Sequence, residues 1–109
     1  MTRGSAPYPL IGKWRITEAD LWDKAYLDML DPAFIEFKSN GRGEVRFGCV
    51  VGGLDCSYSP AAVDFTWQGN DEMDEASGDG IALLEDDGSL TVELSFDNGD
   101  DATLKAKKW

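Results

Sequence analysis

The sequence contains no histidine, and this absence excludes a large part of enzyme chemistry. Histidine is the usual side chain that exchanges protons near neutral pH. Without it there is no Ser-His-Asp or Cys-His nucleophile, no histidine metal ligand and no proximal haem ligand. Carboxylates remain, but most fall in predicted turns where water solvates them, and no two must share a cleft. We therefore expect a protein that is not an enzyme and that binds no cofactor.

Basic residues are absent from more than half of the chain. No Lys or Arg occurs from Phe47 to Leu104, a stretch that holds fourteen of the 21 acidic residues, and the formal net charge is −11. Nucleic acids and anionic membranes carry the same sign, so we expect neither as a partner. Two interpretations remain. The charge either keeps the protein in solution or forms an acidic face that docks a basic protein or mimics nucleic acid.

Long apolar runs and a secretion signal are also missing. The longest aliphatic run, Ile81 to Leu84, is far too short to span a membrane, and residues 1–9 contain no apolar signal segment. We expect a cytoplasmic protein with one domain over residues 1–109, of which residues 1–9 form a flexible N-terminus. The sequence does not indicate an oligomeric state.

Apolar and polar residues alternate along most of the chain, which is typical of half-buried strands. The pattern predicts eight strands, at residues 11–17, 33–38, 44–51, 54–58, 63–68, 80–85, 90–96 and 101–107. Eight antiparallel strands joined mostly by hairpin turns leave two open edges, which closure of the sheet removes. We predict an all-β, mainly antiparallel, eight-stranded up-and-down meander barrel. A two-sheet β-sandwich is the alternative.

Charge pairs suggest the register of the first predicted hairpin, which turns at residues 39–42. If Phe37 faces Val45 on the inner side, Lys38 lies opposite Glu44 and Glu36 opposite Arg46. Opposite charges across two strands stabilise a hairpin, so we predict this register.

Gly52 and Gly53 predict the turn of the next hairpin, because both glycines tolerate positive φ. Counting outward pairs Cys49 with Cys56 and Phe47 with Tyr58, all on the inner face. The cysteines are not spaced as a CxxC motif. We expect two buried thiols, with a cross-strand disulfide as the alternative.

The segment from Asp20 to Leu30 interrupts the strand pattern. Trp22, Tyr26, Met29 and Leu30 recur at helical spacing. Asp20 or Asp23 suits an N-cap, and Asp31-Pro32 suits a stop. The pattern predicts one short amphipathic helix after the first strand.

An acidic segment, Gly69 to Asp79, is predicted to be a long loop. Its charged residues Asp71, Glu72, Asp74 and Glu75 are the candidate partner-binding residues, for a basic protein. The segment lacks the glycine that an EF-hand loop needs at its sixth position, so we predict no metal site.

Inward aromatic residues have two interpretations. They line a cavity for an apolar ligand, or they fill a narrow eight-stranded barrel, and no charged residue is predicted inside. If the barrel is hollow, the candidate ligand-binding residues are Trp22, Tyr26, Phe37, Phe47, Tyr58, Phe65 and Trp67.

The first predicted strand opens with Gly12-Lys13-Trp14, which resembles the G-x-W start of lipocalins and related calycin barrels. The resemblance implies that Trp14 packs under a closed end of the barrel. It also implies that a basic side chain of the last strand, Lys105, Lys107 or Lys108, lies across the indole. A lid after the first strand is a further feature of such barrels.

A second resemblance extends over most of the chain. Its residues are Trp22-Asp23-x-x-Tyr26, Phe47-Gly48, Asp55-Cys56, Trp67-x-Gly69-Asn70-Asp71-Glu72-Met73-Asp74 and Gly78-x-Gly80. Together they resemble a group of small acidic bacterial proteins of unknown function, so no activity is implied.

The leading hypothesis is a non-enzymatic binding or regulatory protein that acts on a protein partner through its acidic surface. In a closed barrel, Lys13 and Arg15 would lie beside Lys105 and Lys107, away from the acidic half. The alternative is a lipocalin-like carrier of a small apolar ligand.

Overall fold

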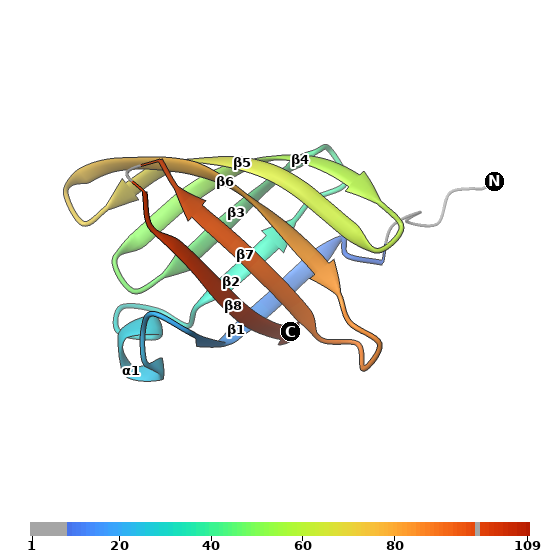
Figure 1. Cartoon of the computed structure of the whole chain (residues 1–109), viewed down its shortest axis with the longest axis horizontal. Coiled ribbons are helices and arrows are strands. Elements are labelled where there is room, and N and C mark those ends of the chain that lie inside the picture. Colours follow the sequence, from blue (N-terminus) through green and yellow to red (C-terminus); the bar gives the residue numbers. More distant parts are fainter. Residues whose placement is uncertain (1–8, 98) are drawn as a thin grey trace.

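The strands form one closed antiparallel barrel in a computed structural model that describes residues 9–97 and 99–109 (Figure 1). Each strand pairs with its neighbours in sequence, and the last strand returns to the first. This confirms the predicted eight-stranded barrel over the sandwich. The elements are β1 (Gly12–Ala19), α1 (Lys24–Leu27), β2 (Phe34–Phe37), β3 (Arg42–Phe47), β4 (Val50–Ser59), β5 (Ala62–Asp71), β6 (Asp74–Leu84), β7 (Leu90–Phe96) and β8 (Asp101–Lys108).

Of the N-terminal segment expected to be flexible, residues 1–8 lie outside the described part of the chain. Within the described part, no helix has the length and apolar character needed to cross a membrane.

The seam between β1 and β8 closes the barrel. Trp14 lies opposite Lys108 and Ile16 opposite Ala106, and a bulge then shifts the register so that Glu18 lies opposite Lys105. The bulge increases local twist, which helps a small sheet to curve back onto its first strand.

Side chains at alternate positions of all the strands form the core. In β5, Val63, Phe65 and Trp67 are buried, whereas Asp64 and Thr66 between them are exposed. The predicted inward faces of β1, β2, β7 and β8 are confirmed in the same way. Burying a large apolar side chain contributes about 1.5–3 kcal/mol, so this alternation fixes which face of each strand points inward.

The β2–β3 hairpin keeps its predicted faces, but its register is shifted by two residues. Ile35 lies opposite Val45 and Phe37 opposite Gly43, so the predicted pairing of Phe37 with Val45 is wrong. Glu36 lies opposite Glu44, and the predicted charge pairs of Glu36 and Lys38 do not form. A shorter loop causes the shift, because Lys38 N–H donates to the Arg42 carbonyl across a turn that ends in a left-handed glycine, Gly41 at φ 82°.

The turn of the β3–β4 hairpin is Gly48-Cys49, not Gly52-Gly53. Phe47 lies opposite Val50, and the two later glycines lie inside β4. The predicted turn is wrong because contacts with the α1 segment require a glycine at position 48. It adopts φ 53°, and its N–H donates to the Leu27 carbonyl at 2.8 Å while the ring of Tyr26 packs against its Cα.

Two cross-strand pairs that depended on the predicted turn are also wrong. In the β3–β4 pairing, Phe47 lies opposite Val50 and Cys49 stands in the turn, so neither the Cys49–Cys56 nor the Phe47–Tyr58 pair exists. Val51, predicted inward, is 38% exposed. Leu54, Cys56 and Tyr58 keep the inward phase, because moving the turn changes the faces only of Val50 and Val51, which lie between the observed and the predicted turn.

The acidic segment from Gly69 to Asp79 is a β-hairpin rather than a loop. β5 continues to Asp71 and β6 starts at Asp74, with Glu72 in the turn at φ 58°. Gly78 and Gly80 occupy inward positions of β6 opposite Trp67 and Phe65. The aromatic side chains contact the space where a Cβ would stand, so glycine is required there and the first half of β6 has no apolar signal of its own.

The helix is shorter than predicted, because α1 has only four residues. Asp23, one of two predicted caps, accepts from the Tyr26 N–H at 2.9 Å. Leu27 is its buried residue, whereas Met29 and Leu30, expected to be buried, are 51% and 67% exposed. The helix ends here because the Asp28 carboxylate accepts from the Ala33 N–H at 2.9 Å and draws the chain toward β2.

Candidate functional site

The aromatic residues predicted to line a cavity contact one another inside the barrel. Phe37, Phe47, Phe65 and Trp67 are buried. The ring centroids of Phe37 and Phe65 lie 6.3 Å apart, and those of Trp67 and Phe96 lie 5.0 Å apart. These are contact distances for aromatic pairs, so rings from different strands fill the interior between them.

Trp22 covers the end of the barrel beside α1. Its ring centroid lies 5.0 Å from that of Phe47, 5.8 Å from that of Tyr26 and 6.2 Å from that of Phe96. Tyr58 lies toward the other end of β4, where its hydroxyl donates to the Lys38 carbonyl. Burial raises the pKa of Tyr58 to about 12. The seven predicted ligand-binding residues therefore do not form one lining, because they spread from one end of the barrel to the other.

The segment that carries Trp22 is held by the Asp28 carboxylate. Lys24 Nζ lies 2.8 Å and an Arg15 guanidinium nitrogen 2.9 Å from one Asp28 oxygen, while the Ala33 N–H donates to the other. The Lys24 hydrogen bond, followed by those of Ala33 and Arg15, lowers the pKa of Asp28 to about 2. Asp28 thus binds the segment to β1 and keeps Trp22 over the core.

Trp14 closes the opposite end of the core. Its Nε1–H donates to the Leu10 carbonyl at 2.9 Å, and Lys108 Nζ lies 4.9 Å from its ring centroid. Gly12 adopts φ 135°, and the Lys108 ammonium occupies the space of its missing Cβ. Of the three lysines considered for this contact, the structure therefore places Lys108 across the indole.

The two thiols are distant from each other and half-buried rather than fully buried. Cys49 lies in the β3–β4 turn and Cys56 in β4. Desolvation raises the pKa of both thiols, and the Glu72 and Asp71 carboxylates raise that of Cys49 further. Both side chains are therefore weak nucleophiles at neutral pH.

The predicted partner-binding residues surround the β5–β6 turn. Glu72, Asp74 and Glu75 are exposed, Asp71 is half-buried, and Met73 at the tip is 97% exposed. The turn lies at the same end of the barrel as α1 (Figure 1). Across residues 9–97 and 99–109, no three Asp, Glu, His or Cys side chains gather as a metal site would require.

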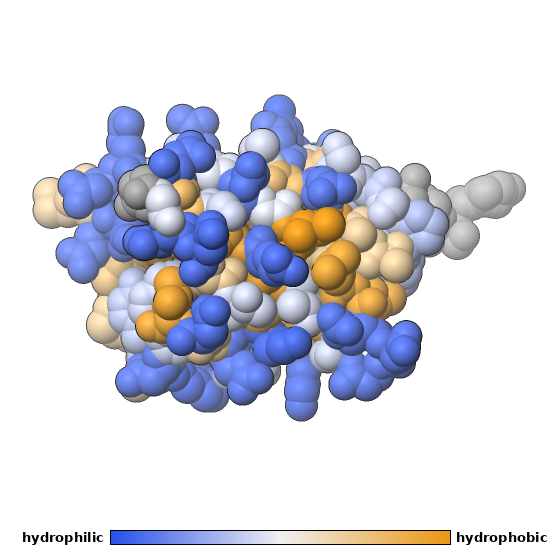
Figure 2. All heavy atoms as spheres, in the orientation of Figure 1, coloured by the Kyte–Doolittle hydropathy of each residue, from blue (hydrophilic) through white to orange (hydrophobic). Residues whose placement is uncertain are grey.

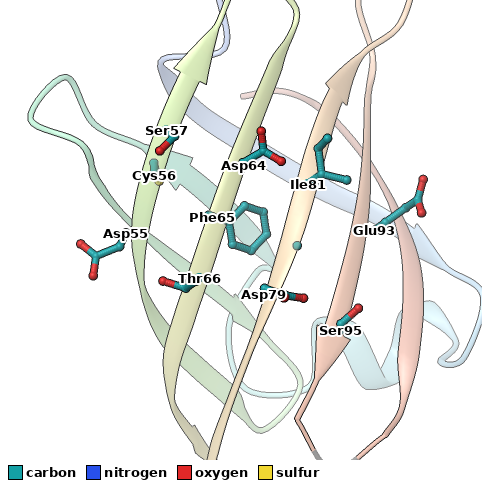
Figure 3. Close-up of a pocket in the computed structure, with 11 residues that line it drawn as sticks. Asp55, Cys56, Ser57, Asp64, Phe65, Thr66, Asp79, Ile81, Glu93 and Ser95 are labelled. Atoms are coloured by element: carbon teal, nitrogen blue, oxygen red, sulfur yellow. The ribbon is translucent and has the colours of Figure 1, made fainter.

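A shallow cleft on the outer face of the barrel was not predicted. It has a volume of about 680 Å³ and crosses β4, β5, β6 and β7 (Figure 3). We call it the trough. Its lining residues are Asp55, Cys56, Ser57, Asp64, Phe65, Thr66, Asp79, Gly80, Ile81, Glu93 and Ser95. Alternation had placed Asp64 and Thr66 outward, but Asp79 was hidden because β6 has glycines at its inward positions.

Most carboxylates of the trough have no partner within the described chain. The side-chain carboxylates of Asp64, Asp79 and Glu93 make no ion pair or hydrogen bond to any described residue. Asp55 lies 3.3 Å from Arg42, and both side chains are mostly exposed. Exposed pairs of this kind contribute about 0–1 kcal/mol, so the carboxylates of the trough remain available to an external cation.

Basic side chains gather on the other side of the barrel. Arg15 of β1 lies opposite Lys107 of β8, as the sequence predicted. Lys13 Nζ lies 4.3 Å from the ring centroid of Phe34 and 4.5 Å from that of Trp109. The outer surface is therefore polarised, with cations on the β1–β8 seam and on β3, and carboxylates but no cations on β4–β7.

Apolar residues do not dominate the visible surface. Figure 2 shows hydrophilic residues over most of the rim of one face, with hydrophobic residues in separate patches between them. Exposed large apolar side chains are spread over the α1 segment, β4, the β5–β6 turn and the C-terminal residue: Leu21, Met29, Leu30, Val51, Met73 and Trp109. Charge is thus the more organised property of the exterior.

Comparisons of the chain with protein-family models, characterised proteins and solved structures gave no match.

Proposed function

We propose that this protein is a non-enzymatic binding or regulatory protein that docks a basic protein partner on the acidic outer face of β4–β7. The face comprises the trough and the β5–β6 turn with Asp71, Glu72, Asp74 and Glu75. Its negative potential extends about 8 Å at physiological salt, and it steers a cationic partner toward the surface.

One observation carries this proposal: the carboxylates of the trough have almost no cations of their own. A solubilising surface needs only net charge, and interspersed ion pairs do not harm it. Five basic residues lie on the β1–β8 seam: Lys13, Arg15, Lys105, Lys107 and Lys108. Arg42 and Arg46 lie on β3, and no basic residue occurs between Phe47 and Leu104, the stretch that forms β4–β7. Such separation of charge favours recognition of an oppositely charged partner.

The carrier alternative has less support. A ligand inside the barrel would have to displace the rings of Trp22, Phe47 and Phe96. The ring centroid of Trp22 lies 5.0 Å from that of Phe47 and 6.2 Å from that of Phe96. The Trp14–Lys108 contact agrees with kinship to lipocalin-like barrels, but such kinship does not require a ligand.

Site-specific photo-crosslinking in the native host tests the proposal. A photoreactive residue at Gln68, exposed on the acidic face, should capture a partner with a basic surface. The same group at Lys107, exposed on the β1–β8 seam, is the matched control and should not capture it. Capture that is equal at both positions, or that persists in 0.5 M salt, would contradict the proposal.

A further inference from the structure

We propose that the trough binds an extended basic segment of the partner in polyproline II conformation, with Lys or Arg at every third residue. The segment lies across β4–β7 rather than along them. This inference rests on the proposed function, because it assigns the part of the basic partner that enters the acidic face.

The register of the sheet arranges the trough into two rows. The first row runs through Asp55, Thr66, Asp79 and Ser95 on β4, β5, β6 and β7. In the second row, Ser57, Asp64, Ile81 and Glu93 occupy the same strands. Figure 3 shows both rows on the outer face. Each row thus carries a carboxylate on every second strand, and the rows are offset by one strand.

The spacing along a row selects the conformation of the bound segment. Neighbouring strands lie about 4.8 Å apart, so the backbone positions that carry carboxylates on alternate strands lie about 9.6 Å apart. A polyproline II helix has three residues per turn and rises about 3.1 Å per residue, which places every third side chain on one face about 9.3 Å apart. In an extended β-strand, side chains of one face repeat at about 6.7 Å, which does not match.

The chemistry of the rows agrees with this occupant. Asp64, Asp79 and Glu93 have no ion pair with a described residue and are exposed, so two lysines of one segment face two carboxylates. Half-buried Ile81 lies between Asp64 and Glu93 and offers an apolar contact to a residue between the lysines. A neighbouring cleft of about 470 Å³ shares Asp55, Thr66 and Asp79, which gives the segment room to continue.

Binding of two peptides of equal composition tests the inference. One repeats Lys-Pro-Pro four times, and the other has its four lysines in succession followed by the prolines. Fluorescence anisotropy at low salt should give a dissociation constant at least tenfold lower for the periodic peptide. The variant Asp64→Asn/Glu93→Gln removes the two unpaired carboxylates that flank Ile81 and should weaken binding of that peptide about tenfold, as expected for the loss of two exposed ion pairs. The matched control Asp71→Asn/Asp74→Asn loses the same charge at the β5–β6 turn and should change binding less than twofold.

Two other results have different consequences. Equal affinity for the two peptides, or equal losses in the two double variants, would overturn the trough inference and leave the docking proposal standing. If neither peptide binds at low salt, the acidic face does not recognise basic segments and the trough inference is wrong, whereas the docking proposal is decided by the photo-crosslinking experiment. Circular dichroism of each variant shows whether it keeps the fold.

Discussion

Trp14 offers the strongest test of how the barrel is stabilised. The side chain is 2% exposed, its Nε1–H donates to the Leu10 carbonyl, and Lys108 lies across its ring. Truncation to Ala removes a large buried ring and leaves a cavity, which costs about 3–5 kcal/mol. Trp14→Phe keeps most of the packing but leaves the Leu10 carbonyl without its donor, which costs about 1–3 kcal/mol.

Urea denaturation and thermal melting of both variants measure these costs. For a domain of this size, 1 kcal/mol corresponds to about 4–8 °C in Tm, so Trp14→Ala should melt more than about 12 °C below the parent. The Tm of Trp14→Phe should lie between those of Trp14→Ala and the parent. A Trp14→Ala protein that melts within a few degrees of the parent would refute the argument, because Trp14 would then not support the closed end.

Three further predictions concern Asp28, the cysteines and the acidic turn. Asp28→Asn should lower the free energy of unfolding by about 1–2 kcal/mol at neutral pH, after allowance for solvent screening. The folded state lowers the pKa of Asp28 from 3.8 to about 2. The stabilisation by Asp28 is therefore full above about pH 4 and disappears as the pH falls through about 2. Acid titrations of the stability of parent and variant measure this difference. Cys49 and Cys56 are separated by about 23 Å of strand, so mass spectrometry after mild oxidation should find no disulfide within one chain. Calorimetry should detect no Ca²⁺ binding tighter than about 10⁻⁵ M at the β5–β6 turn, and tighter binding would reveal a site that the ligand spacing does not predict.

The fold class was predictable because one face of each strand is apolar. Val63, Phe65 and Trp67 alternate with exposed residues, and a shift of one residue would expose all three side chains. Strand count and closure followed from such segments and from the need to avoid open edges.

The β3–β4 turn and the boundaries of β5 and β6 were not predictable, because they depend on contacts between distant residues. Gly52 and Gly48 look equally suited to a turn in the sequence. The ring of Tyr26 and the carbonyl of Leu27 select Gly48, whereas Gly52 lies against the Trp67 ring inside β4. Local propensity contains no information about such contacts.

The trough was missed for a related reason. β6 places Gly78 and Gly80 inward under the rings of β5, so its alternation has no apolar residues at these positions. The outward Asp79 was therefore assigned to a loop. The negative charge of the surface was evident from composition. The arrangement of its carboxylates in rows depends on the pairing of four strands.

The association rate with a captured basic partner tests the docking proposal most directly. It should fall steeply as salt is raised, and it should fall again when Asp71, Glu72, Asp74 and Glu75 are all changed to Lys, with a smaller change in the dissociation rate. A melting curve checks that the changed β5–β6 turn leaves the barrel folded. If the association rate is unaffected by both salt and the charge reversal, the acidic face does not dock a partner and serves only to keep the protein in solution.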